Sequence, residues 1–246
     1  MKKVILGIFT ACVSVFILML RQAGNTSFKT HHIPFFTNSA SVKLLFIADL
    51  HKRRINYRDF ANAGEIELIC LGGDLAEKST RNKTIEHNLQ ILSAMAPIYF
   101  VWGNNDYEKK EVLQELFKKY GVIELNNDNI FFEAKGWTLA GVEDIKLLRD
   151  DTALSLAGSR GPVLLLSHNP EAVWKLPLIH NVKLVLSGHT HGGQIRLGPW
   201  GIDELGGLKE RNKVLLLLSN GYGTTGLPLR FGARPELHIV HLLHHR

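Results

Sequence analysis

Eight short apolar runs follow one another along the chain between residues 42 and 243. Each run is five to eight residues long, rich in Val, Ile and Leu, and nearly continuous rather than alternating with polar residues. Strands that are covered on both faces have this pattern. We therefore predict eight buried β-strands, at residues 42–48, 66–71, 98–102, 137–142, 163–167, 182–187, 214–219 and 236–243.

Two segments between these runs have helical periodicity. Residues 80–95 place Ile85, Leu89 and Leu92 on one face, and residues 107–119 also carry their apolar side chains on one face. Helices alternate with strands only in the first half of the chain, and strands follow one another directly after that. We predict an α/β fold in which two mixed sheets pack together with helices outside them.

The N-terminus carries seventeen uncharged residues, from Val4 to Leu20, between a Lys pair and Arg21. As a helix, this stretch is just long enough to cross a bilayer. We predict an uncleaved signal anchor at residues 1–21. A cleaved signal peptide and a buried core helix are the alternatives. The basic residues before the stretch favour a single-pass protein whose body lies outside the cytoplasm.

The polar and small residues 22–41 are predicted to be a tether, and residues 42–246 a single domain. The net charge is +6 and the pI about 9.3, but the basic residues are scattered and form no patch, which argues against nucleic-acid binding. They suit an anionic membrane or a phosphorylated substrate equally well. Cys12 and Cys70 lie in unrelated segments, so no disulfide is expected.

Five of the apolar runs end directly in polar residues of one chemical kind. The clusters are Asp49-Leu50-His51, Gly72-Gly73-Asp74, Gly103-Asn104-Asn105-Asp106, His168-Asn169 and Gly188-His189-Thr190-His191. Ligands of open α/β sheets gather at the carboxyl ends of strands, and glycines let the backbone approach a ligand closely. We expect seven side chains to converge: Asp49, His51, Asp74, Asn104, His168, His189 and His191.

These seven side chains comprise two carboxylates, one amide oxygen and four imidazoles, which is too many polar groups to bury without partners. One zinc ion needs three or four ligands, so seven fit two cations if one carboxylate bridges them. Two cations about 3.5–4 Å apart can activate water and stabilise an in-line phosphoryl displacement. Oxygen and nitrogen donors without sulfur favour manganese, iron or zinc over copper(I).

Taken singly, most of these clusters have an ordinary structural explanation. Asp-x-His or Gly-Gly-Asp after a strand is usually a turn, and a lone His at a strand end is usually a hydrogen-bonded residue. Gly-His-Thr-His is more specific, because packing rarely requires two His residues two positions apart. The ordered set of five clusters, each following a strand, favours a metal site.

In this order, D-x-H, G-D, G-N-x-D, a lone His and G-H-x-H resemble the signature of the calcineurin-like metallophosphoesterase superfamily over residues 42–243. SHNPE (167–171), GHTHGGQIRL (188–197) and GYGTTGLPLRFGARPE (221–236) look like its small, often membrane-anchored bacterial branch related to the UDP-2,3-diacylglucosamine hydrolases. The resemblance implies a four-layer αββα sandwich of two mixed sheets, in agreement with the strand pattern.

The resemblance also implies how the cations would be held. The first would bind Asp49, His51, Asp74 and His191, and the second Asp74, Asn104, His168 and His189, with Asp74 as the bridge. A water or hydroxide between the cations would be the nucleophile. Manganese is the expected metal, with zinc, iron or magnesium as alternatives.

Asn105 departs from the family pattern, which usually has His at this position. Asn can donate a hydrogen bond but cannot act as a general acid. We predict that Asn105 contacts the substrate phosphate and suits a leaving group that needs no proton, such as the phosphate side of a pyrophosphate. The alternatives are weak or absent activity, or a proton from another residue. Arg53 and Arg54 are predicted either to bind the substrate phosphate or to be solvated charges.

The sequence thus predicts a dinuclear metal-dependent phosphohydrolase that cleaves a phosphodiester or pyrophosphate in a phosphorylated lipid or small molecule at a membrane. The alternatives are a phosphatase or cyclic-nucleotide phosphodiesterase for soluble substrates, and a catalytically weak metal-bearing binding protein. Residues 221–226 match the dinucleotide pattern G-x-G-x-x-G, but Pro228 and Pro235 oppose the helix that this motif requires, so we predict a loop beside the metal site. The His-rich residues 241–246 are predicted to end a final strand.

Overall fold

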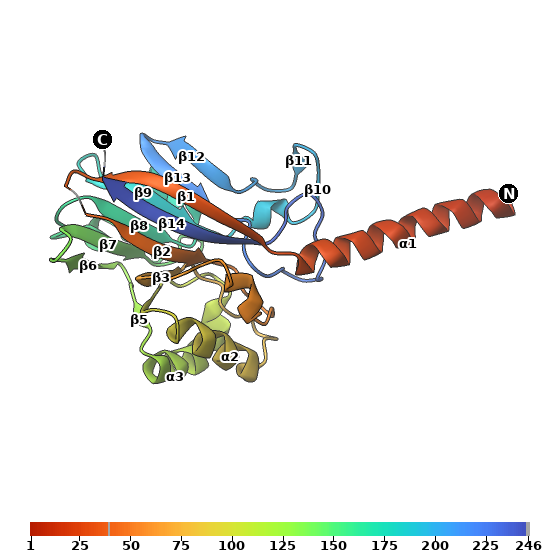
Figure 1. Cartoon of the computed structure of the whole chain (residues 1–246), viewed down its shortest axis with the longest axis horizontal. Helices are drawn as coiled ribbons and strands as arrows, with labels where there is room; N and C mark the ends of the chain where they lie inside the picture. Colours follow the sequence, from red (N-terminus) through yellow and green to blue (C-terminus); the bar gives the residue numbers. More distant parts are fainter. Residues whose placement is uncertain (39, 245–246) are drawn as a thin grey trace.

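The structure is a computed structural model that describes residues 1–38 and 40–244, and two six-stranded sheets form its centre (Figure 1). Sheet A consists, in spatial order, of β1 (Ser27–Phe36), β14 (Glu236–His244), β2 (Val42–Ile47), β3 (Leu68–Leu71), β4 (Ile98–Phe100) and β5 (Ile123–Glu124). Sheet B consists of β12 (Gly207–Arg211), β13 (Val214–Leu218), β9 (Val182–Ser187), β8 (Val163–Ser167), β7 (Trp137–Val142) and β6 (Asp128–Phe132). All eight predicted strands are present.

Helices lie on the outer faces of the two sheets, as predicted. Sheet A is covered by α2 (Asn82–Ser93) and α3 (Lys110–Tyr120), with η1 (Tyr57–Phe60) and η2 (Asp106–Lys109) beside them. Sheet B is covered by the short α4 (Thr152–Ser155) and η3 (Pro170–Trp174), so this fourth layer is much thinner. A small hairpin of β10 (Arg196–Leu197) and β11 (Trp200–Gly201) follows η4 (His191–Gly193).

Continuous apolar strands are buried on both faces, which explains their sequence pattern. Phe46 of sheet A and Leu164 and Leu184 of sheet B belong to one buried cluster between the sheets. Leu89 of α2 and Phe117 of α3 belong to a second cluster on the other face of sheet A. The predicted α/β sandwich of two mixed sheets flanked by helices is confirmed.

The predicted tether at residues 22–41 is wrong for most of its length. The N-terminal helix α1 (Lys2–Gly24) runs past the predicted anchor boundary, and β1 then pairs in parallel with β14 at the edge of sheet A. The sequence hid β1 because its first half is polar and half-exposed, and because Pro34 fits only an edge strand. Residue 39 of the tether and residues 245–246 of the His-rich tail lie outside the described residues; residues 241–244 of that tail belong to β14.

The direction of the strands places α1 and the polar clusters at the same end of the sandwich. β2, β3 and β4 are parallel to one another, β14 is antiparallel to β2, and β1 is parallel to β14. The start of β1, where α1 joins, therefore lies at the end where β2–β4 finish. The end of β8 lies there too, since His168 Nδ1 is 2.9 Å from the carbonyl oxygen of Gly72. We call this the carboxyl end of the sandwich, marked by Asp49, Asp74, Gly103, His168 and Gly188.

Candidate metal centre

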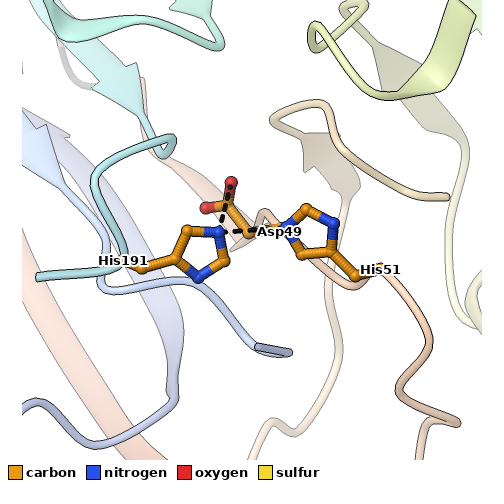
Figure 2. A group of neighbouring side chains, drawn as sticks. All are labelled: Asp49, His51 and His191. Carbon is orange, nitrogen blue, oxygen red and sulfur yellow. Dashed lines mark hydrogen bonds and ion pairs between the residues drawn. The ribbon is translucent and has the colours of Figure 1, made fainter. Parts of the chain in front are cut away.

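One group of predicted ligands, Asp49, His51 and His191, meets at the carboxyl end (Figure 2). His51 Nε2 and His191 Nε2 are 3.0 Å apart, and His191 Nε2 is 3.7 Å from Asp49 Oδ1. Two segments far apart in the sequence supply these atoms, namely the loop after β2 and the loop after β9. All three side chains are buried.

A second group contains His168 and His189, which follow β8 and β9. His189 Nδ1 lies 2.9 Å from His168 Nε2. Asp74 connects the two groups, because its Oδ2 is 3.7 Å from His51 Nε2 and 3.5 Å from His168 Nε2. Six of the seven predicted ligands are therefore within 4 Å of another member of the set.

The seventh predicted ligand, Asn104, lies in the loop after β4 beside Gly103. Its Oδ1 atom is buried and has no hydrogen-bond partner among the described residues. A buried amide oxygen without a donor is costly, and a cation is one partner that would satisfy it. The position of Asn104 therefore fits its predicted role.

The donor atoms are spaced as ligands of divalent cations are. Ligand atoms 2.0–2.2 Å from one ion lie roughly 3–3.5 Å from one another. The distances of 2.9–3.7 Å within the His51–His191 and His168–His189 groups agree with that spacing. The residues present thus fit divalent cations, and the oxygen and nitrogen donor set fits manganese, zinc, iron or magnesium.

The backbone at the site is unusual for residues with side chains. Five predicted ligands have φ values between 49° and 76°, in the left-handed region: Asp49, His51, Asp74, His189 and His191. Such conformations are uncommon outside Gly and cluster at functional sites.

Two glycines permit the close approach of the ligand loops. A Cβ atom on Gly103 would lie 2.3 Å from Asp74 Oδ1, and one on Gly188 would lie 2.4 Å from Asp49 Oδ2. Residues 221–226 form a loop that borders the site, as predicted, and Gly223 N–H donates to the carbonyl of Asp49 at 2.7 Å. The glycine pattern thus serves the metal centre rather than a dinucleotide.

Asn105 holds the Asp74 carboxylate, which connects the two groups of predicted ligands. Its backbone N–H donates to Asp74 Oδ1 at 2.9 Å, and its side-chain Nδ2 donates to Asp74 Oδ2 at 2.6 Å. The predicted contact of Asn105 with a substrate phosphate remains a prediction. Asn104 therefore presents an amide oxygen without a hydrogen-bond partner among the described residues, and Asn105 holds the carboxylate of Asp74.

Asp106, which the sequence analysis left without a role, joins two of the ligand loops. Its Oδ2 accepts the N–H groups of Asp74 at 2.7 Å and Gly103 at 2.9 Å, and its Oδ1 accepts that of Ala76 at 2.9 Å. The side chain is fully buried. Its place in the same Gly-Asn-Asn-Asp cluster was the available signal.

Arg230 is a second residue that the sequence analysis missed. Its guanidinium is fully buried and donates to the backbone carbonyls of His191, Asn220, Gly223 and Ala233. Burial lowers the pKa of Arg230 only to about 10, so it stays charged. It fixes the loop that carries His191 against the loop after β13.

Arg53 and Arg54 lie in different environments. The Arg53 guanidinium is half-buried and donates to the carbonyls of Tyr222 (2.5 Å) and Gly24 (3.1 Å), so it is neither free nor solvated. Arg54 is exposed, and its Nη2 is 3.0 Å from His87 Nδ1. Their role in binding phosphate remains a prediction, with a solvated charge as the alternative for Arg54.

Two imidazoles of the site have pKa values shifted in opposite directions. Burial opposes a charge on His168, but Asp74 and Asp49 outweigh it and raise the pKa of His168 to about 9. Burial, and then the charges of His168 and Lys146, lower the pKa of His189 to about 3. Burial raises the pKa of Asp49 to about 7. Cations bound at the centre would displace the protons from these ligands, so the pKa shifts described here apply to the metal-free site.

A cavity of about 540 Å³ opens beside the second group of ligands. His189 lies on its wall, together with Lys146, Asn169 and Trp174. Lys146 is exposed, and its charge acts on His189. Lys146 lines this cavity and Arg53 does not, a difference that no motif indicated.

Comparisons with known proteins agree with this geometry. The calcineurin-like phosphoesterase family profile matches residues 42–193. The chain is 39% identical to the uncharacterized protein YpbG of Bacillus subtilis, over 97% of this chain and 96% of that one. It is 30% identical to the phosphodiesterase YaeI of Escherichia coli over 87% of each chain. It is 28% identical to a bovine transmembrane protein with a metallophosphoesterase domain, over 84% of this chain and 54% of that one.

The family profile covers more than half of the chain and includes every predicted ligand. The profile, the identity with YpbG over nearly the whole length and the cluster of Asp and His side chains lead to one assignment. The chain belongs to the calcineurin-like phosphoesterase family.

Proposed function

We propose that this protein is a dinuclear metal-dependent phosphohydrolase that cleaves a phosphodiester or pyrophosphate bond in a substrate at a membrane. The observation that carries the proposal is the pair of ligand groups joined by Asp74, whose Oδ2 lies within 3.7 Å of an imidazole nitrogen from each. The name of the relative YaeI, a phosphodiesterase, supports the choice of a phosphodiester. Kinship with the UDP-2,3-diacylglucosamine hydrolases remains a prediction from the sequence.

Each part of the site has a task in this proposal. Asp49, His51, Asp74 and His191 would hold one cation, and Asp74, Asn104, His168 and His189 the other. Two such cations lower the pKa of water and neutralise charge on the phosphate during an in-line displacement. Lys146 would attract the anionic substrate into the 540 Å³ cavity, where the leaving group would lie against Trp174.

Asn105 limits the leaving groups that the site can serve. Its amide is committed to Asp74 and carries no acidic proton. The protein should therefore prefer substrates whose leaving group departs without protonation, such as the phosphate side of a pyrophosphate. Asn105→His should raise hydrolysis of alkyl phosphodiesters relative to pyrophosphates. An unchanged ratio of the two rates would refute this part of the proposal.

The proposed membrane association rests on α1. Among residues 1–38 and 40–244, α1 is the one helix long and apolar enough to cross a membrane, although a signal sequence would meet the same criterion. The bovine relative is named as a transmembrane protein with a metallophosphoesterase domain, which supports an anchor. The body would then lie outside the cytoplasm, according to the charges that flank α1.

The test measures bound metal and hydrolysis of bis-(p-nitrophenyl) phosphate with Mn²⁺, Zn²⁺ or Mg²⁺. The unchanged protein should bind two ions per chain and turn over the substrate. His189→Ala should bind one ion fewer and lose at least about a hundredfold in activity, because one of the two cations is lost. His180→Ala changes a His outside the centre and should retain both properties. Metal binding without hydrolysis under every condition would instead establish a metal-bearing binding protein.

A further inference from the structure

The N-terminal helix is fixed to the loops that build the metal centre. The last turns of α1 accept hydrogen bonds from Arg230 N–H at Met19 O and from Arg53 Nη2 at Gly24 O, at 3.2 and 3.1 Å. The same Arg230 holds the carbonyl of His191, and Arg53 lies two residues after His51. The helix and the metal centre are therefore adjacent parts of one rigid arrangement at the carboxyl end.

Large apolar side chains project from the same end. Leu197, Trp200 and Ile202 of the β10–β11 hairpin are 69%, 77% and 92% exposed, and Leu227 is 68% exposed. We call these four residues the apolar rim. Figure 1 shows the hairpin beside the base of α1.

Hydrogen bonds join the apolar rim to the base of α1. Gln194 Nε2 donates to the carbonyl of Thr225 at 3.1 Å, and Arg196 N–H donates to that of Phe231 at 2.7 Å. The next residue, Gly232, donates its N–H to Gln22 of α1 at 3.2 Å. The hairpin, the loop with Leu227 and the helix therefore keep a fixed arrangement.

We propose that the apolar rim rests in the interface of the bilayer that α1 spans, so that the metal centre opens at the membrane surface. This inference depends on the proposed membrane association and deepens it. Soluble proteins seldom expose several large apolar side chains together, and membrane surfaces are one partner that covers them. We take the partner to be a lipid bilayer, because the rim is joined by hydrogen bonds to the base of α1, whose own apolar side chains are exposed.

The length of α1 supports this arrangement. Its uncharged stretch of seventeen residues spans about 25 Å as a helix, which is shorter than the roughly 30 Å hydrocarbon core of a bilayer. A span shorter than the hydrocarbon core is accommodated by local thinning of the bilayer, which brings the parts that flank the helix closer to the bilayer. With no flexible linker between α1 and the body, the carboxyl end is the part that is drawn in. The substrate phosphate would then belong to an amphiphile held in that bilayer.

Leu178 and Ile179 provide a matched control. Both are fully exposed and apolar, and they precede β9, whereas the metal ligands follow β9. A strand of six residues separates them from the carboxyl end by about 20 Å. A membrane contact through the rim leaves these two residues in water.

Tryptophan fluorescence tests the contact without relying on catalysis. The full chain would be placed in vesicles of phosphatidylglycerol and phosphatidylcholine with brominated acyl chains, which quench nearby indoles. Trp102 and Trp137 are buried, so Trp174→Phe leaves Trp200 as the exposed indole. Its emission should be quenched, and that of a W174F/W200F/L178W variant should not. Equal quenching of the two variants, or none in the first, would overturn the proposal.

Two substrates with the same nitrophenyl leaving group test the consequence for catalysis. Hexadecyl p-nitrophenyl phosphate resides in vesicles, and bis-(p-nitrophenyl) phosphate is soluble. Trp200→Glu and Leu227→Glu should each lower the ratio of vesicle to soluble activity about tenfold, and Leu178→Glu should leave it unchanged. An unchanged ratio in the rim variants contradicts the inference. Absence of hydrolysis of both substrates would refute the proposed function instead, while the fluorescence would still decide the membrane contact.

Discussion

Asp106→Asn is the smallest change that tests how the ligand loops are held together. The carboxylate accepts three backbone N–H groups with its two oxygens, from Asp74, Gly103 and Ala76. An Asn side chain has one oxygen and one NH₂ group. In either orientation its NH₂ group therefore faces at least one buried N–H donor.

The cost follows from these contacts. The cheaper orientation loses the single bond to Ala76, and a buried N–H left without an acceptor costs about 1–3 kcal/mol. The two remaining bonds, to Asp74 and Gly103, weaken because a neutral amide oxygen is a poorer acceptor than a carboxylate. We expect a decrease of about 2–4 kcal/mol in the free energy of unfolding. Because Asp74 loses its support, we also expect at least about tenfold weaker Mn²⁺ binding.

Asp144→Asn is the matched control for this measurement. Asp144 is also a buried carboxylate, but its Oδ1 accepts one backbone N–H, from Leu147 at 2.9 Å, and its Oδ2 has no partner among the described residues. Asn can place its NH₂ group at the free position and should cost less than about 1 kcal/mol. Urea unfolding with a chelator present and calorimetric Mn²⁺ titration give both quantities. Equal urea midpoints for the two variants, with unchanged Mn²⁺ affinity, would refute the reasoning.

Three further predictions concern stability. Arg230→Met should lower the free energy of unfolding by about 3–5 kcal/mol in urea unfolding, because four buried carbonyls lose their donors. A loss below about 1 kcal/mol would contradict the role of Arg230 in holding these carbonyls. Chelation should lower the midpoint of thermal unfolding, since ligand at a hundred times its Kd adds about 2.7 kcal/mol; calorimetry with and without EDTA checks this, and an unmoved midpoint counts against a bound cation. Burial opposes a charge on Glu236, but His238, Lys29 and Asn220 outweigh it and lower its pKa from 4.5 to about 2. The stability from Glu236 is therefore present above pH 4.5 and lost as pH falls toward 2; of about 3 kcal/mol, most should vanish by pH 2.5 in urea unfolding, and Glu236→Gln should remove that dependence.

The strands and the ligands could be predicted because both leave local signals. A strand buried on two faces must be apolar along its whole length, so each run marks its own boundaries. Asp49, Asp74 and His168 stand at the first polar position after such a run, where the sheet places side chains on one edge. Convergence of these residues follows from strand direction alone, before any contact is known.

The residues that the sequence did not indicate act through contacts between distant segments. Arg230 is buried because four carbonyls face it, one from the loop after β9 and three from the loop between β13 and β14. The motif at residues 221–236 contains Arg230, but no local pattern shows which carbonyls its side chain meets. A strand such as β1 exists because the edge of β14 is available to it. Its own residues would suit an extended linker equally well, which is why a tether was predicted at that position.

The left-handed backbone at five ligands indicates that the body, rather than the cations, maintains the site. Each such residue costs roughly 1–3 kcal/mol and persists only where its surroundings enforce it. At Asp74 the enforcing contacts come from Asp106 and Asn105, and at Asp49 from the N–H groups of His189 and Gly223. The donors are N–H groups, and Asp106 is not a predicted ligand, so these contacts form without a bound cation. The ligand loops are therefore preorganised before metal binds, so a cation could be removed and another bound without refolding of the domain.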